Sequence, residues 1–294
     1  MKNTLNQFKI NDNSDTELTQ KSTQRGDLGG QYLHYKRLIS FSFLLFSLIQ
    51  FSFSQQSQDS ITNLFDNLKV GELPYRLLKP LNFDTKKKYP VILSLHGAGG
   101  RGTDNTKQIA DSKWLKYLAT EDVRKNYSCF IVAPQSTTLW SEEQLKLLKT
   151  IIKYLPSVDM KRVYVLGHSM GGHGSYRFIQ LDPTFFAAAA PSAGSGLPET
   201  ENFIDVNKIK HIPIWAFHGD KDPKCPYEKD VKVFDEMTKV GGNMKFTTWH
   251  GDAHGGPVAL KMLTGANNGT TQMSSNQCDP EPVFLKWLFK QTKK

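Results

Sequence analysis

Short apolar runs alternate with amphipathic stretches from about residue 60 to the C-terminus of this 294-residue chain. The runs with strand-forming composition are residues 74–79, 91–95, 129–133, 162–166, 186–190, 212–217 and 244–249. Several of them are continuously apolar, which is typical of strands covered on both faces. Strands of this kind, separated by helical stretches, predict an α/β protein with a mostly parallel sheet and helices on both faces.

Helical periodicity is clearest over residues 142–155, where Leu145, Leu148 and Ile152 fall on one face behind a Ser141 cap. The other predicted helices are residues 111–118, 172–181, 229–239 and 282–291. No internal repeat and no Pro/Ser-rich linker interrupts this part of the chain. We therefore expect one domain over residues 55–294.

The N-terminal part follows a different pattern. Lys36 and Arg37 precede an apolar stretch, residues 38–53, that ends in small residues. A basic segment, an apolar segment and a small-residue cleavage site make a secretory signal, and the stretch is shorter than the roughly 20 apolar residues of a spanning helix. We expect residues 1–54 to be an N-terminal extension with a signal peptide, and the protein to be secreted or periplasmic. An uncleaved anchor is the alternative, and only that alternative implies contact with a membrane.

The formal net charge of +9 is spread along the chain, and its densest runs are only residues 86–88 and 293–294. No aromatic residues are interleaved with a basic block. This distribution is typical of solvated surface, so we do not expect nucleic-acid binding.

Candidate chemistry follows the predicted strands. Ser169 lies in Gly167-His168-Ser169-Met170-Gly171, directly after one predicted strand and before a helix. In the G-x-S-x-G elbow the chain turns so sharply that the nucleophilic serine needs small residues two positions away on either side. A second glycine-rich loop, His96 to Gly100, follows another strand, and its backbone N–H groups can approach a substrate oxygen.

The acid and the base should also follow strands, because ligands bind beyond the carboxyl ends of a parallel sheet. The order nucleophile, acid, base leaves only His250 and His254 as candidate bases after the acid. We favour His254, since His250 still belongs to the predicted strand. For the acid we favour Asp222, at a turn before a proline, and keep Asp220 as the alternative.

Five segments resemble the α/β-hydrolase superfamily, and within it the single-domain esterases related to feruloyl esterases, polyhydroxybutyrate depolymerases and "predicted peptidase" carboxylesterases. They are YPVILSLHGAGGRGTDN, IVAPQ, RVYVLGHSMGGHGSY, IPIWAFHGDKDP and EPVFLKWLFKQ, in that order. The resemblance implies an α/β-hydrolase fold with the catalytic residues Ser169, Asp222 and His254. It also implies that the backbone N–H groups of Met170 and Ala98 form the oxyanion hole.

Few apolar residues separate the strands at 186–190 and 212–217, so we expect no large lid and an open cleft. Export and an open cleft favour a secreted serine esterase that removes acyl or feruloyl groups from a polysaccharide or a related polymer. Gln135 and Trp140 are candidate substrate-lining residues, with loop packing as the alternative. Such an enzyme needs no metal or organic cofactor, and its expected partner is a small or polymer-attached ester.

The chain departs from the family after His254, where a polar stretch runs to Cys278. We expect this stretch to reshape the rim of the cleft. Cys225 and Cys278 are then expected at the same end of the sheet, where they either form a disulfide or remain free thiols, with Cys129 buried in its strand.

Other functions remain open at this point. A peptidase or a general short-chain carboxylesterase would use the same triad, and a binding module would use none of it. The alternate spacing of His250, Asp252 and His254 also suits chelation of a metal, but a metal site leaves the serine elbow unexplained.

Overall fold

The structure is a computed structural model that describes residues 61–110, 112–197 and 203–293. These residues belong to one compact unit, Gln55–Lys294. The predicted signal segment at residues 38–53 and the predicted boundary at residues 54 and 55 lie outside the described residues. Within the described ranges, no helix combines the length and the apolar character that crossing a membrane requires.

The strands are β1 (Asp66–Val70), β2 (Leu73–Leu78), β3 (Tyr89–Leu95), β4 (Phe130–Pro134), β5 (Val158–His168), β6 (Ala188–Ser192), β7 (Ile214–Gly219), β8 (Met244–Trp249) and β9 (Gly269–Met273). The helices are η1 (Ala98–Gly100), α2 (Lys107–Ala110), α3 (Lys113–Leu118), α4 (Glu121–Asn126), α5 (Glu142–Tyr154), α6 (Met170–Leu181), α7 (Val206–Ile209), α8 (Tyr227–Lys239), α9 (Gly256–Thr264) and α10 (Phe284–Lys290).

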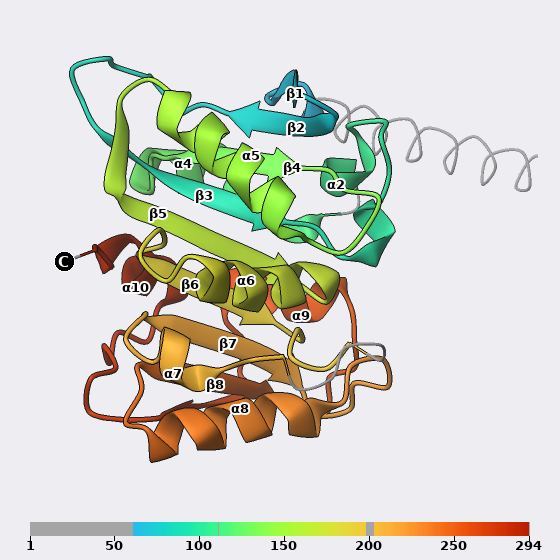
Figure 1. Cartoon of the computed structure of the whole chain (residues 1–294), viewed down its shortest axis with the longest axis vertical. Coiled ribbons are helices and arrows are strands. Elements are labelled where there is room, and N and C mark those ends of the chain that lie inside the picture. The colour runs from blue at the N-terminus through green and yellow to red at the C-terminus, as the bar shows by residue number, and fades with distance from the viewer. Residues whose placement is uncertain (1–60, 111, 198–202, 294) are drawn as a thin grey trace, which may run out of the picture. The chain divides into compact units, whose positions relative to one another are not determined.

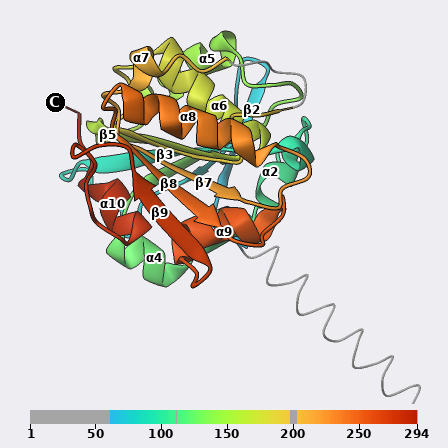
Figure 2. The same cartoon turned by 90° about the horizontal axis from the view of Figure 1, so that it is seen from below.

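All nine described strands form one sheet in the order β1-β2-β4-β3-β5-β6-β7-β8-β9. Figure 1 shows β1 to β8, and Figure 2 shows the edge strand β9. The strands from β4 to β8 run parallel, while β1, β2 and β9 pair antiparallel at the two edges. The strand order reverses between β3 and β5. In open α/β sheets the crevice at such a reversal, beyond the carboxyl ends of the strands, is the usual place for a ligand.

Helices cover both faces of the sheet, with α5, α6, α7 and α8 on one face and α4, α9 and α10 on the other (Figure 2). Each face carries its own apolar cluster. Residues of β3, β4, β6, β7 and β8 are buried throughout, because they contribute side chains to both clusters in turn. The predicted α/β-hydrolase architecture is confirmed.

Helix α5 illustrates how the local sequence determines an element. Ser141 caps its first turn by accepting from the backbone of Gln144, whose side chain accepts in return from the Ser141 backbone N–H. Two otherwise unpaired N–H groups are satisfied in this way. Leu145, Leu148 and Ile152 then face the sheet. The predicted cap and the predicted apolar face are both confirmed.

Several predicted bounds were displaced, and short elements were missed. β5 spans 11 residues instead of the predicted five, and β6 begins two residues later than predicted. β1, α2, α4, α7, α9 and β9 were not predicted. All five residues of β9 are exposed, so its sequence lacks the apolar signal on which the prediction relied. The described part of the segment between β6 and β7 contains the four-residue helix α7.

Three backbone segments meet closely where the site begins. A Cβ atom placed on Gly171, in the first turn of α6, would lie far closer than 3.0 Å to the carbonyl oxygen of Leu95 at the end of β3. A Cβ atom on Gly167 would meet the carbonyl of Gly171 in the same way. The two glycines therefore let β3, β5 and α6 approach at the switch point.

Gly171→Ala should lower the free energy of unfolding by about 2–3 kcal/mol, because backbone atoms have to move to admit the methyl group. Gly99→Ala is the matched control, since a Cβ atom there meets nothing within 4 Å, and it should change stability by less than about 0.5 kcal/mol. Urea denaturation measures both. Equal effects of the two substitutions would contradict the close approach.

Candidate active site

Ser169 is held in a backbone conformation that side chains rarely adopt. Its φ is 57° and its ψ is −120°, between the end of β5 and the start of α6. Its N–H donates to the carbonyl of Ser192 at 2.9 Å, and its own carbonyl accepts from the N–H of His173 at 2.9 Å. A non-glycine residue at positive φ costs about 1–3 kcal/mol and persists only where surrounding contacts hold it. The two backbone hydrogen bonds are such contacts.

Two other predicted residues lie in a row with Ser169. Ser169 Oγ lies 2.9 Å from His254 Nε2, and His254 Nδ1 lies 2.6 Å from Asp222 Oδ2. The Asp222 side chain is 1% exposed and the His254 side chain 9% exposed. A carboxylate fixes the tautomer of an imidazole in this arrangement, so that Nδ1–H donates to Asp222 and Nε2 accepts from the serine hydroxyl.

The turn after β7 supplies the remaining partners of Asp222. Its Oδ1 accepts from the backbone N–H groups of Lys224 at 2.8 Å and Cys225 at 2.9 Å. Burial alone raises the pKa of this carboxyl, but hydrogen bonds from His218, from the Cys225 backbone and from His254 outweigh burial and lower the pKa well below its usual range. Asp222 is therefore ionised at neutral pH.

The alternative acid and base pair with each other instead. Asp220 Oδ1 accepts from the N–H of Gly251 at 2.7 Å, and its Oδ2 lies 3.1 Å from His250 Nδ1. His250 Nε2 contacts Thr270 of β9 at 2.8 Å. Asp220 and His250 thus hold the two loops after β7 and β8 together, and neither of them contacts Ser169 through a hydrogen bond.

His218, which precedes the predicted acid in the chain, lies directly behind Asp222. Its Nε2 is 3.1 Å from Asp222 Oδ2, the same oxygen that His254 contacts, and its Nδ1 is 2.6 Å from Asp230 Oδ2. Asp230 Oδ1 in turn accepts from the hydroxyl of Tyr176 on α6 at 3.3 Å. Only the His-Gly-Asp sequence at the end of β7 could have drawn attention to this histidine.

A buried histidine between two carboxylates has an altered pKa. The His218 side chain is 0% exposed. Burial lowers its pKa, but hydrogen bonds and charge interactions with Asp222 and Asp230 outweigh burial and raise the pKa to about 9. His218 is therefore a cation at neutral pH, and it donates to both carboxylates.

The two predicted oxyanion donors lie at helix starts beside Ser169. Met170 is the first residue of α6, and Ala98 is the first residue of η1. Gly97, one residue earlier, approaches the nucleophile so closely that a Cβ atom there would lie 3.6 Å from Ser169 Cβ. The first N–H groups of a helix have no partner within that helix, so both positions offer free donors near the serine.

The prediction that Gln135 and Trp140 line the substrate site is wrong, because each is only 1% exposed. The Gln135 side chain holds the glycine loop instead: its Oε1 accepts from the N–H of Asn105 at 2.5 Å, and its Nε2 donates to the carbonyl of Gly100 at 3.1 Å. The Trp140 ring packs on that of His96 at 4.9 Å. Loop packing was the correct alternative.

The prediction that Cys225 and Cys278 lie at one end of the sheet is also wrong. Both thiols are free and buried. Cys278 Sγ donates to the carbonyl of Met244 at the amino end of β8, whereas Cys225 follows the carboxyl end of β7. The polar stretch after His254 does not simply form a rim. It forms α9 and then the edge strand β9, which returns the chain to the opposite end of the sheet.

The spacing of His250, Asp252 and His254 does not produce a chelating group. The Asp252 carboxylate binds Lys261 and Asn268 rather than either histidine. Among the described residues, one group has the composition and proximity to hold a metal, and it consists of Asp222, Cys225 and His254. The three side chains are those of the predicted acid, the predicted base and a neighbouring thiol.

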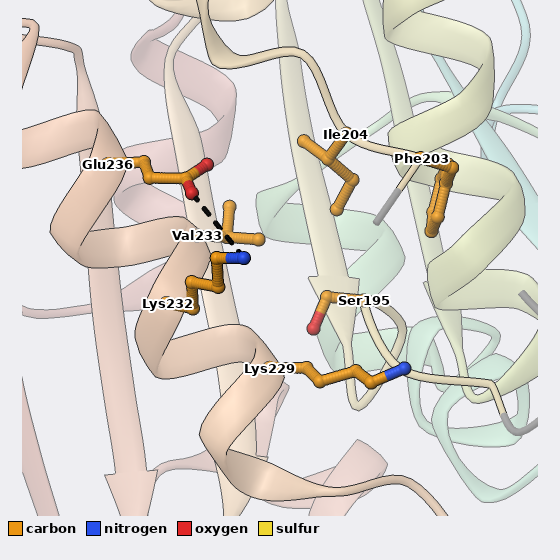
Figure 3. A pocket seen from close by; sticks show the side chains of 7 residues that line it. All are labelled: Ser195, Phe203, Ile204, Lys229, Lys232, Val233 and Glu236. Atoms are coloured by element: carbon orange, nitrogen blue, oxygen red, sulfur yellow. Dashed lines mark ion pairs between the residues drawn. The ribbon is translucent and has the colours of Figure 1, made fainter. Parts of the chain in front are cut away.

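Hollows near the site differ in size. A hollow of about 130 Å³ is lined by His96, Gly97, Gly99, Gly100, Lys107, Gln108, Ser112, Trp114 and His168, and so borders the glycine loop and the elbow. A crevice of about 20 Å³ lies between α8 and the segment after β6, where Lys232 and Glu236 form an ion pair (Figure 3). A third hollow, of about 220 Å³, involves α9 and β9 and no triad residue. Only the first combines space for an organic group with proximity to Ser169.

Comparison with known proteins agrees with this fold. A model of the dienelactone hydrolase family matches residues 132–262. A probable feruloyl esterase C of Aspergillus flavus is 24% identical over 181 residues, which make up 59% of this chain and 64% of that protein. A venom dipeptidyl peptidase 4 of Vespa velutina is 23% identical over 66% of this chain but only 30% of its own length.

Among solved structures, a thermostable esterase is 29% identical, with a TM-score of 0.62, over 79% of this chain and 64% of that chain. The chain thus spans less than two thirds of the length of the feruloyl esterase and of this esterase. The predicted resemblance to the α/β-hydrolase superfamily is confirmed.

The raised pKa of His218 predicts how stability depends on pH. Its stabilising charge is fully present below the unfolded pKa, near 6.5, and is lost as pH rises through the folded pKa of about 9. The free energy of unfolding should therefore fall between pH 6.5 and 9. In Asp230→Asn, which removes one carboxylate, the fall should occur at lower pH.

Urea denaturation at a series of pH values measures this dependence. Asp235→Asn, at an exposed carboxyl on the same helix, is the control and should keep the wild-type profile. A profile that is identical in wild type and Asp230→Asn would contradict a protonated His218.

Proposed function

We propose that this α/β-hydrolase is a serine esterase that cleaves carboxylic esters through an acyl-enzyme. One observation carries the proposal: the hydrogen-bonded row from Ser169 Oγ through His254 to Asp222, with the serine on a strained elbow. The elbow exposes the hydroxyl to a substrate, and the row gives that hydroxyl a base.

The geometry supports a two-stage reaction. Ser169 Oγ attacks the ester carbonyl carbon while His254 Nε2 accepts the hydroxyl proton. Asp222 keeps the imidazole oriented and stabilises the imidazolium. The tetrahedral intermediate then collapses as His254 returns the proton to the leaving alcohol. Water, activated by the same histidine, attacks the acyl-enzyme and releases the acid together with free Ser169.

The N–H groups of Met170 and Ala98 bind the oxyanion of the tetrahedral intermediate in this proposal. Both stand at helix starts next to the serine. Ala98 is exposed, so a carbonyl oxygen can reach this position from solvent. Loss of one such donor typically raises the barrier by about 3–4 kcal/mol.

The proposed substrates are acyl or feruloyl esters attached to a polysaccharide or a related polymer. The name of the Aspergillus relative supports this class. The hollow beside the glycine loop suits a compact acyl group. The proposed location, secreted or periplasmic, rests on the apolar segment at residues 38–53.

A serine peptidase is the second candidate, because relatives of this chain include proteins named peptidases. The chain covers only 30% of the venom dipeptidyl peptidase. The match covers 64% of the feruloyl esterase, and this larger share favours an esterase. A general short-chain carboxylesterase would share every step of the mechanism and differ only in the alcohol that it accepts.

Ser169→Ala should lower kcat/KM for nitrophenyl acetate by at least about 10⁴-fold, since the nucleophile is lost while the rest of the site remains. It should also abolish labelling by a fluorophosphonate. Ser195→Ala is the matched control: this serine is 4% exposed and lies after β6, and the variant should still be labelled. Full ester hydrolysis by Ser169→Ala would overturn the proposal.

A substrate panel tests the acyl and alcohol components separately. Acetylated and feruloylated oligosaccharides should give a higher kcat/KM than nitrophenyl esters with the same acyl group, because an open cleft admits the sugar. A peptide nitroanilide should react far more slowly. Activity restricted to simple esters would remove the polymer assignment, and efficient amide cleavage would favour the peptidase.

A further inference from the structure

A buried thiol lies against the triad, and the proposed ester hydrolysis does not use it. Cys225 is 2% exposed. One ligand atom from each of Cys225, Asp222 and His254 can be chosen so that all three lie within 4.8 Å of one another. Such a group combines sulfur, oxygen and nitrogen ligands at one point.

The turn after β7 fixes this position. The backbone N–H of Cys225 donates to Asp222 Oδ1 at 2.9 Å, and its carbonyl accepts from His218 Nε2 at 3.1 Å. Because the backbone is held at both groups, the thiol has little freedom to leave the triad. The position is a product of the same turn that holds the carboxylate.

We propose that Asp222, Cys225 and His254 form an inhibitory site for a thiophilic divalent cation such as Zn²⁺. Thiolate, imidazole and carboxylate are the three ligand types that zinc takes in proteins, and a water completes the four-coordinate site. Tetrahedral bonding needs ligand atoms roughly 3.3–3.7 Å apart. The group therefore has to contract by about 1 Å at its widest separation.

Binding involves no electron transfer. The Cys225 thiol releases its proton to solvent as the sulfur–metal bond forms, and the carboxylate binds as the anion. The imidazole binds through Nε2 in its present tautomer, or through Nδ1 once the Nδ1 proton has moved to Nε2. The thiolate and the Asp222 carboxylate then bring two negative charges to the two positive charges of the cation. A buried cluster without net charge avoids the cost of an uncompensated ion.

Occupation of this site is incompatible with a working triad. Nδ1 of His254 contacts Asp222, and Nε2 contacts Ser169. A metal bound to either nitrogen breaks one of these hydrogen bonds. The cation thus removes either the base from the serine or the orienting carboxylate from the base. The inhibitory effect rests on the proposed function, whereas binding itself does not.

Binding is tested first, on the full chain carrying Ser169→Ala, which keeps all three ligands and needs no activity. Zn²⁺ should be taken from a chromophoric chelator with one equivalent bound per chain. Co²⁺ in its place should give a thiolate-to-metal charge-transfer band in the near ultraviolet. Adding Cys225→Ala should abolish the band, whereas adding Cys278→Ala should leave it.

Inhibition is tested second, on chains with Ser169. Zn²⁺ should block both fluorophosphonate labelling and hydrolysis of nitrophenyl acetate, Mg²⁺ should not, and EDTA should restore both. In Cys225→Ala the half-inhibitory Zn²⁺ concentration should rise at least about tenfold, measured against the metal-free rate of the same variant. Cys278→Ala is the control, because it removes a buried thiol at the amino end of β8, away from the triad. Its half-inhibitory Zn²⁺ concentration should match that of the wild type.

The outcomes separate the two proposals. Zinc binding with a Cys225-dependent cobalt band in a chain that hydrolyses no ester would support the metal site and refute the esterase. Ester hydrolysis with no Zn²⁺ bound, or with binding that is unchanged in Cys225→Ala, would overturn the metal site alone. Circular dichroism of each variant confirms that the fold is retained.

Discussion

An ionised carboxylate in an almost dry environment is the constraint around which this site is built. The Asp222 side chain is 1% exposed, and an unpaired charge at such a position would be prohibitively costly. Two backbone N–H groups and two imidazoles compensate it. One of the imidazoles, His218, is itself a buried cation, and it requires the second carboxylate of Asp230. The triad therefore depends on a row of alternating charges that runs from Asp222 through His218 to Asp230.

This row connects elements that are distant in sequence. Asp222 follows β7, and Asp230 lies on α8. Tyr176, which donates to Asp230, lies on α6 about two helix turns after Ser169. Two chains of hydrogen bonds thus connect Asp222 to the segment that carries Ser169. One passes through His254 to the serine itself. The other passes through His218 and Asp230 to Tyr176 on α6. Such a closed arrangement fixes the orientation of the acid with respect to the helix that carries the nucleophile. It also explains why α8 contributes a buried aspartate to an otherwise apolar face.

Much of the fold was predictable, since the central strands are buried on both faces and therefore appear as continuous apolar runs. β9 was not predictable, because Gly-Thr-Thr-Gln-Met is exposed along its whole length and pairs on one side only. The location of Cys278 was wrong for the same reason: without β9, nothing in the sequence returns the chain to the amino end of β8. An edge strand is determined by its neighbour more than by its own side chains.

The triad itself could be found from chain order and from the position of each residue after a strand. His218 could not, because order eliminates it as a base and says nothing about a histidine behind the acid. Gln135 and Trp140 also follow a strand, and this property suggested a role in substrate binding. Their side chains turn inward and hold the glycine loop. Position at the carboxyl end of a strand identifies a region, whereas the direction of a side chain depends on tertiary contacts.

The central claim is that Ser169 becomes acylated during turnover. Rapid acid quenching of the enzyme a few turnovers after mixing with a nitrophenyl ester, followed by peptide mass spectrometry, detects this intermediate. The account predicts the mass of the acyl group on the peptide that contains Ser169. Steady turnover with no acylated peptide, or with the acyl group on another residue, would contradict it.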